Sequence, residues 1–298
     1  MKTKPAANTA HEAKQLGLAR RGLAAGAFSG AVWGLDGVLL GVAMALAPFV
    51  SGASLLAAPL AAAALHDGFA AVWLLIANTS AGKFKELGRT IASRPGRAVM
   101  LGALCGGPIG LAGYLLGIKY AGAAYAMAVS ATYPAIGAVL AMIFLKERIS
   151  PRAWGGIALC VAGAAVVGYT PAAATGLPHF KLGIALSLLA ALGWGLESVL
   201  SAHGMDVLDP DIAINIREGV SFIVYAAVVL PLAGGLGIAA SAFGHTKALL
   251  ICAATGLCGA ASYLAWYRAL NTAGVGRAMS LNITYAMWGI VYGVLFTG

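Results

Sequence analysis

The feature that most limits how this chain can fold is a series of long apolar segments. A helix needs about 20 consecutive apolar residues to cross the hydrocarbon core of a bilayer. Segments of this kind follow one another along most of the 298 residues. They predict nine membrane-spanning helices, at 22–46, 53–78, 98–118, 121–145, 151–170, 182–204, 212–237, 247–269 and 274–298.

The composition supports this class of fold and excludes a soluble one. Only 10% of the residues are charged, whereas a soluble domain carries about 25%. The 41 glycines suit helices that pack through small residues in lipid. The four cysteines lie inside apolar segments and form no metal-binding pattern. We therefore expect an all-α polytopic membrane protein with no cofactor and no metal.

The basic residues predict the orientation in the membrane. The net charge is +9, and 15 of the 19 Lys and Arg residues lie in the tail 1–21 or in even-numbered loops. Positively charged loops stay in the cytoplasm, so the tail is expected there. The sixth loop is acidic, with Asp206, Asp209 and Asp211, but acids weigh little in this rule. Orientation explains the positive charge without a nucleic-acid partner.

Two parts of the chain resemble each other. Residues 33–39 read Trp-Gly-Leu-Asp-Gly-Val-Leu and residues 194–200 read Trp-Gly-Leu-Glu-Ser-Val-Leu, so five of seven positions are identical. Further matches follow in the same order. They are His66-Asp67-Gly68 with Arg217-Glu218-Gly219, Leu104-Cys105-Gly106 with Leu257-Cys258-Gly259, and Thr132-Tyr133 with Thr284-Tyr285.

These matches predict two copies of a five-helix unit, at 22–170 and 171–298. Because five is odd, the second copy enters the membrane upside down. Inverted repeats are typical of secondary transporters, whose substrate site lies near the midplane between the repeats. The span at 151–170 has no counterpart in the second copy. We therefore expect a tenth helix after Gly298, although loss of that helix is the alternative.

These features together resemble the drug/metabolite transporter superfamily in its EamA-type branch. The resemblance is carried by the Trp-Gly start of each repeat, Arg94-Pro95, Pro134, and the Phe-Leu-Lys-Glu-Arg ending at 144–148. The second repeat lacks the Lys-Glu ending and has Ala286 in place of the proline. Within the superfamily, the chain looks most like the YddG-type amino-acid exporters. The resemblance implies export of amino acids, aromatic ones among them, across a bacterial inner membrane.

Ionisable residues inside the predicted spans are the main candidates for function. Each costs at least about 2.5–3.5 kcal/mol at the bilayer centre, so it should face a cavity or a partner. They are Asp36, His66, Asp67, Glu197, Arg217 and Glu218. Trp33 lies on the same helix side as Asp36, and Trp194 on the same side as Glu197. With Tyr133 and Tyr285 these residues could line one cavity, or they could serve packing alone.

The adjacent charged pairs predict contacts between helices. Neighbouring residues on a helix point about 100° apart, so neither pair is expected to close on itself. We expect Arg217 to meet Asp36, Asp67 or Glu197. His66 either carries a proton during transport or only donates a hydrogen bond in a packed core. Pro134 predicts a kink in its span, which is either a gate or a static feature.

The function that follows is secondary transport of a small metabolite by alternating access. A channel or a non-transporting adaptor is the alternative, although the sequence has no repeated carbonyl filter. No His-Glu-x-x-His or Gly-x-Ser-x-Gly motif is present, so an enzyme is not expected. The expected partners are the substrate and the lipid bilayer. The oligomeric state is open, and a monomer is plausible.

Overall fold

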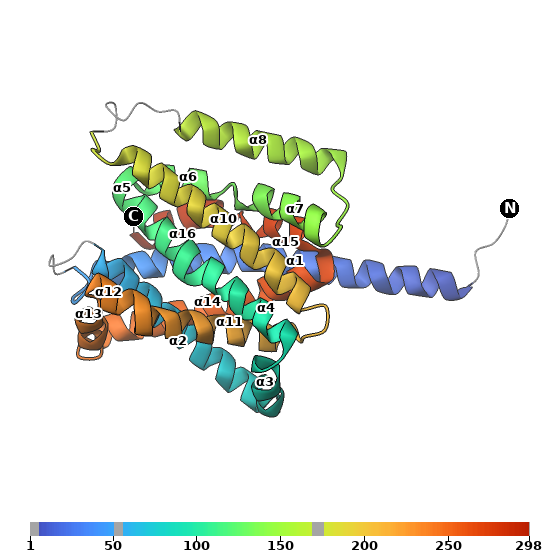
Figure 1. Ribbon diagram of the computed structural model, residues 1–298, viewed down its shortest axis with the longest axis horizontal. Helices are drawn as coiled ribbons and strands as arrows, with labels where there is room; N and C mark the ends of the chain where they lie inside the picture. Colours follow the sequence, from blue (N-terminus) through green and yellow to red (C-terminus); the bar gives the residue numbers. More distant parts are fainter. Residues whose placement is uncertain (1–5, 51–55, 169–175, 298) are drawn as a thin grey trace.

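The computed structural model describes residues 6–50, 56–168 and 176–297, and this part of the chain is helical throughout its regular elements. Figure 1 shows the helices gathered into one bundle, with α1 extending beyond it toward the N-terminus. The elements are α1 (Ala6–Met44), α2 (Ala57–Ser80), α3 (Phe84–Ile91), α4 (Arg94–Leu104), η1 (Cys105–Leu111), α5 (Ala112–Ala121), α6 (Ala123–Ser130), α7 (Tyr133–Phe144), α8 (Pro151–Gly168), α10 (Phe180–Gly204), α11 (Pro210–Val224), η2 (Tyr225–Val229), α12 (Leu230–Ala233), α13 (Leu236–Ala242), α14 (Thr246–Ala273), α15 (Val275–Asn282) and α16 (Tyr285–Thr297).

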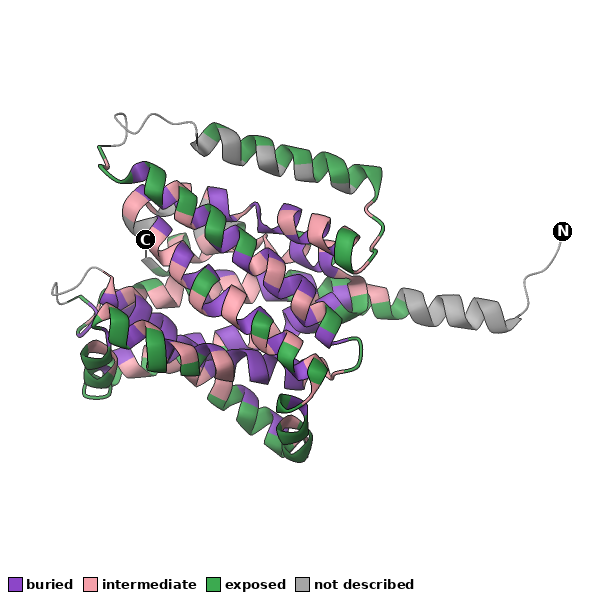
Figure 2. Ribbon diagram, in the orientation of Figure 1, coloured by how far each residue is buried: buried purple, intermediate pink, exposed green. Residues whose placement is uncertain are grey.

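Seven helical stretches in the described residues are long and apolar enough to cross a membrane. They are Gly17–Met44, Ala57–Ser80, Arg94–Gly117, Phe180–Gly204, Pro210–Ala233, Thr246–Ala273 and Val275–Phe296. The chain is therefore an integral membrane protein. Large apolar side chains such as Leu159 and Leu232 are exposed on the bundle, which suits contact with lipid. Figure 2 shows the buried residues concentrated between the helices.

Two of the nine predicted spans are not among these seven stretches. The span predicted at 121–145 is divided into α6 and α7. The chain turns at Ala131 and Thr132, and α7 begins with Tyr133 and Pro134. Proline has no N–H to continue the preceding helix, but α15 and α16 are also divided before Tyr285, where no proline follows, so Pro134 alone does not account for the break. The span predicted at 151–170 forms α8, which packs only on α6 and α7 among its principal contacts (Figure 1).

Local sequence explains where several helices begin. The Ser93 hydroxyl accepts a hydrogen bond from the Gly96 N–H at 3.0 Å, and Pro95 stands in the first turn of α4. Asp209 caps α11 in the same way, accepting from the Asp211 N–H at 2.8 Å, with Pro210 next to it. Side-chain caps and early prolines both favour helix initiation.

The helices of the two predicted repeats interlock. α1 packs against α14, α15 and α16, whereas α10 packs against α4, η1, α5, α6 and α7. The second span of each predicted repeat, α2 and α11, also pack together. Glycines allow some of these approaches. A methyl group on Gly30 or Gly34 of α1 would clash with the backbone around Asn282 and Tyr285.

The acidic sixth loop is neutralised by basic residues of other loops. Lys83 Nζ lies 2.7 Å from Asp209 Oδ2 and 2.9 Å from Asp211 Oδ2. Arg268 Nη2 lies 2.9 Å from Asp211 Oδ1. Partial burial lowers the pKa of Lys83, but the hydrogen bonds to the two aspartates outweigh it and hold that pKa above its ordinary value. Parts of the second, sixth and eighth loops thus meet at one end of the bundle.

Cysteine labelling tests which end of the bundle faces the cytoplasm. Ser51, in the first predicted loop, lies outside the described residues, but its exposed neighbour Val50 does not. In a background without native cysteines, Val50→Cys should react with an impermeant thiol reagent on intact cells. Lys85→Cys should react only after permeabilisation, because the positive loop stays inside. Labelling of Lys85→Cys alone on intact cells would reverse the orientation.

Candidate functional site

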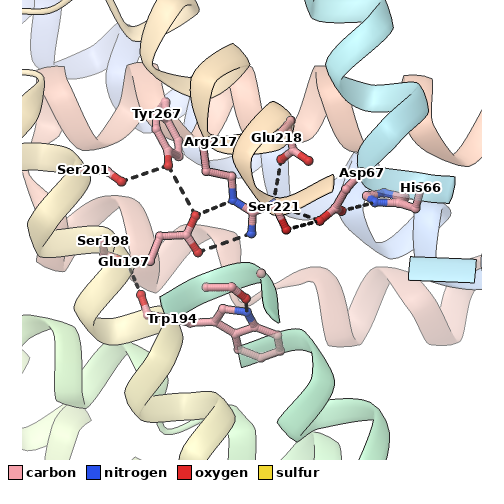
Figure 3. Close-up of polar contacts among 12 residues, drawn as sticks. His66, Asp67, Trp194, Glu197, Ser198, Ser201, Arg217, Glu218, Ser221 and Tyr267 are labelled. Atoms are coloured by element: carbon pink, nitrogen blue, oxygen red, sulfur yellow. Dashed lines mark hydrogen bonds and ion pairs between the residues drawn. The ribbon is translucent and has the colours of Figure 1, made fainter. Parts of the chain in front are cut away.

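The buried ionisable residues form one connected network between α1, α2, α10 and α11. All six are at most 2% exposed: Asp36, His66, Asp67, Glu197, Arg217 and Glu218. Figure 3 shows five of them joined across the helices, all except Asp36. The structure therefore brings together residues that the sequence singled out only by their position inside apolar segments.

Arg217 is the centre of this network. Its Nε donates to Glu197 Oε1 at 2.6 Å, and its Nη1 donates to Glu218 Oε1 at 2.9 Å. Nη1 also lies 3.7 Å from Asp67 Oδ2. The guanidinium carbon sits 4.6 Å from the ring centroid of Tyr263, a favourable cation–π position. Of the three partners expected for Arg217, Glu197 is the one that accepts a hydrogen bond from it.

His66 links the network to α1. Its Nδ1 lies 2.9 Å from Asp67 Oδ1, and its Nε2 lies 3.4 Å from Asp36 Oδ1. The second oxygen of Asp67 accepts a hydrogen bond from the Ser221 hydroxyl at 2.5 Å. The imidazole is thus held between two carboxyl groups from different helices.

One expectation about the adjacent pairs is wrong. Both pairs close on themselves, His66 with Asp67 and Arg217 with Glu218. The backbone directions of neighbours differ by about 100°, but the side chains are long enough to bend around the helix surface. Partners on other helices exist as well, so each base bridges its sequence neighbour and a second helix.

A cavity of about 350 Å³ lies beside this network. Its lining includes Trp33, Asp36, His66, Tyr114 and Tyr285. The indole of Trp33 meets the His66 ring edge-on, with centroids 5.9 Å apart. The remaining lining is apolar and includes Val38, Leu40, Leu111 and Leu115. The cavity thus combines an aromatic wall with one carboxyl–imidazole pair.

The other predicted aromatic residues surround a smaller space of about 30 Å³. Trp194, Glu197 and Tyr133 line it, together with Trp33 and Tyr285, which also face the larger cavity. Trp194 donates from Nε1 to the Gly106 carbonyl at 3.1 Å. Trp33 and Trp194 are therefore not equivalent, because only Trp33 borders the large cavity.

Tyr133 belongs to a hydrogen-bond chain between the helices. Its hydroxyl donates to Asn282 Oδ1 at 2.6 Å, and Asn282 Nδ2 donates to Ser29 Oγ at 2.8 Å. Ser29 in turn lies 3.1 Å from Ser262. Pro134 lies next to Tyr133 but lines a separate cavity of about 730 Å³, near Arg148 and Arg277. The proposed gating proline is therefore outside the aromatic cavity.

Several contributors were not singled out as site residues in the sequence. Tyr263, Trp266 and Tyr267 lie on α14, and Tyr267 donates to Glu197 Oε1 at 3.3 Å. Their i, i+3, i+4 spacing places them on one helix face, and this spacing could have identified them from the sequence. Ser221 carries no such signal, because a single serine in an apolar helix has no distinctive pattern. Among the described residues, no group of three or more His, Cys, Asp or Glu could hold a metal ion.

Two equivalent glycines make room for the network. A methyl group on Gly106 would overlap the Glu197 carboxylate, and one on Gly259 would overlap the His66 ring. These glycines occupy matching places in the two predicted repeats. Their role was not visible in the sequence, where they only marked the repeat.

Replacing either glycine with alanine should therefore destabilise the fold. Glu197 cannot retreat without losing its bonds to Arg217, so overpacking should cost about 1–3 kcal/mol. We expect lower melting temperatures for Gly106→Ala and Gly259→Ala in detergent. Gly219→Ala is the control, because nothing lies within 4 Å of its added methyl group. Equal melting of all three variants would show that the glycines are not packing against the network.

Comparison with known proteins identifies the family. The model of the EamA-like transporter family matches residues 22–169. Protein LicB of Haemophilus influenzae is 29% identical over 196 residues, which is 65% of each chain. The match thus spans slightly less than two thirds of that relative. Residues 22–169, just under half of the chain, therefore belong to the EamA-like transporter family.

Proposed function

We propose that this protein is a secondary transporter that exports amino acids, aromatic ones among them, from the bacterial cytoplasm across the inner membrane. It works by alternating access at a central cavity between two inverted five-helix repeats. The observation that carries the proposal is the cavity of about 350 Å³, where Trp33, Tyr114 and Tyr285 face the Asp36–His66 pair.

The chemistry of the cavity fits a small amine with an apolar part. The Asp36 carboxyl can accept hydrogen bonds from an ammonium group, and its Oδ1 has no hydrogen-bond partner in the described structure. Aromatic rings give a stacking surface for a flat side chain. His66, when protonated, can meet a substrate carboxylate. The amino and carboxyl groups of an amino acid would therefore both find a partner.

The packing of the helices supports two inverted repeats. The first helix of each repeat, α1 or α10, contacts the third and fourth spans of the other. The fourth spans also break at equivalent places, before Tyr133 in one and before Tyr285 in the other. Such reciprocal packing supports a cavity at the repeat interface, as in transporters built from inverted repeats.

The cavity is displaced toward one end of the bundle. Its lining runs along α1 from Trp33 to Leu40, toward the C-terminal end of that helix. At the other end, Lys83 pairs with Asp209 and Asp211, and Glu147 accepts from the Val275 N–H at 3.0 Å. With the N-terminus in the cytoplasm, this cavity lies toward the outer end of the bundle.

Transport into liposomes tests the proposal. Purified protein should give saturable uptake of some members of a panel of twenty amino acids, with aromatic ones preferred. The panel includes the decarboxylated amines of phenylalanine and tryptophan, which retain the ring and the ammonium group. Preferential uptake of these amines would still support a transporter, but its substrates would be amines rather than amino acids. Uptake that rises linearly with concentration for all solutes would favour a channel, and no uptake would favour an adaptor.

A further inference from the structure

The two repeats carry matching charged clusters of different chemistry. Asp36 and Glu197 occupy equivalent positions, as do His66 and Arg217, and Asp67 and Glu218. In each repeat the base bridges its own neighbour and the acid of the first helix. The repeats therefore share one arrangement, with a permanent cation in the second and a titratable base in the first.

The cluster of the second repeat is held by a permanent cation, and of its carboxyl oxygens Glu218 Oε2 has no hydrogen-bond partner in the described structure. Arg217 uses Nε and Nη2 toward Glu197, at 2.6 and 3.5 Å, and Nη1 toward Glu218. A guanidinium does not lose its proton in proteins. Glu197 of this cluster borders the space of about 30 Å³. The cluster is suited to hold helices α10 and α11 together.

The cluster of the first repeat borders the cavity of about 350 Å³. His66 Nε2 and Asp36 Oδ1 face each other at 3.4 Å, and neither atom has a hydrogen-bond partner in the described structure. Both side chains are at most 3% exposed, and both residues line the cavity of about 350 Å³. Buried polar atoms without partners are rare and point to an exchangeable proton or ligand.

The charges around His66 favour a bound cation. Asp36 approaches it from α1, Asp67 from α2, Arg217 and Glu218 from α11, and Cys258 from α14. With Glu197, the network holds four carboxyl groups but only one permanent cation, Arg217. Burying such an excess of negative charge is costly. A proton or the ammonium group of a substrate would each relieve it.

We propose that Asp36 and His66 form a proton-exchange site, at which the ammonium group of the substrate displaces one proton. The proposal rests on the transport function above. As the ammonium group reaches the Asp36 carboxylate, the proton on His66 Nε2 leaves to water in the cavity and the imidazole becomes neutral. One positive charge enters as one leaves. When the substrate departs, a proton returns, so protons move opposite to the substrate.

Proton binding can be tested without any substrate. Trp33 lies against His66, and a protonated imidazole quenches indole fluorescence. We expect a Trp33 signal, defined by subtraction of Trp33→Phe, that changes as the pH is raised from about 6 to 9, because the surrounding carboxyl groups favour the protonated imidazole. The change should vanish in His66→Gln and persist in His203→Gln, an exposed histidine 3.6 Å from Asp206. A transition that persists in His66→Gln overturns the proposal.

The exchange itself is tested in liposomes that contain a pH-sensitive dye. Uptake of phenylalanine or phenylethylamine should move about one proton outward for each molecule taken up. The transport rate of His66→Gln should vary less than about twofold between about pH 6 and 9, where the rate of the parent varies about tenfold. Asp36→Asn provides a second variant with the same expected loss of coupling. Uptake without proton movement overturns the exchange. If no probe is transported, the proposed function fails, and the fluorescence titration still decides the proton site.

Discussion

Replacing Arg217 with methionine should leave little folded protein. Its guanidinium contacts Glu197 and Glu218 directly and lies near Asp67. Methionine has a similar length but would leave these carboxyl groups buried without their cation. Removing one partner from a buried ion pair costs about 3–5 kcal/mol, which is comparable to much of the stability of a typical protein. We expect loss of the monodisperse species in detergent, or a much lower melting temperature.

Arg268→Met is the matched control for this prediction. Arg268 also pairs with an aspartate, Asp211, but its side chain is 53% exposed. Exposed ion pairs contribute about 0–1 kcal/mol, so this variant should melt close to the parent. Adding Glu197→Gln to Arg217→Met should recover part of the loss, because one unpaired carboxylate is gone. If Arg217→Met melts like Arg268→Met, the buried network does not hold the fold.

Replacing Trp33 with alanine should reduce transport about 2- to 13-fold, since loss of one aromatic contact is worth about 0.5–1.5 kcal/mol. Trp33 borders the large cavity and contacts the rings of His66 and Tyr263. Trp33→Phe keeps a ring and should retain most of the activity. The measurement is the substrate concentration for half-maximal uptake in liposomes. Normal uptake by Trp33→Ala would exclude this residue from the transport path.

Trp194 allows a role in substrate binding, as proposed for Trp33, to be distinguished from a role in helix packing. Its indole N–H donates to the Gly106 carbonyl, a bond that phenylalanine cannot make. Trp194→Phe should therefore lose about 1 kcal/mol of stability, whereas Trp33→Phe should not. Substrate affinity should change little in Trp194→Phe, because this residue does not line the large cavity. The two tryptophans were equivalent in the sequence, and the structure distinguishes them.

Much of the site was visible in the sequence because lipid penalises buried charge. Asp36, His66, Asp67, Glu197, Arg217 and Glu218 stood out for that reason alone, and all of them meet in the structure. The internal repeat paired Thr132-Tyr133 with Thr284-Tyr285, but it did not predict that both fourth spans break at these residues. It could not tell which of two matching residues borders the cavity, because this depends on the displacement of the helices.

Other features of the site depend on tertiary contacts, which the spacing of residues in the sequence does not predict. Ser221 and Gly106 contact the network only because α11 and η1 lie close to it. The contact between His66 and Asp67 depends on side-chain torsions rather than on helix direction. The sequence predicted a kink at Pro134 within the span 121–145. The structure instead divides this span into two helices at Thr132, and that division depends on tertiary packing.

Substrate protection of a cysteine in the cavity tests the central claim most directly. Gly37 lines the cavity, and nothing lies within 4 Å of the Cβ that a cysteine would add there. In a background without native cysteines, Gly37→Cys should react with a small thiol reagent, and saturating substrate should slow this reaction several-fold. Gly41→Cys lies one turn further along α1, also in open space but outside the cavity lining, and its rate should not change. An unchanged rate at Gly37→Cys, with a substrate that the same variant transports, would contradict a substrate site in this cavity.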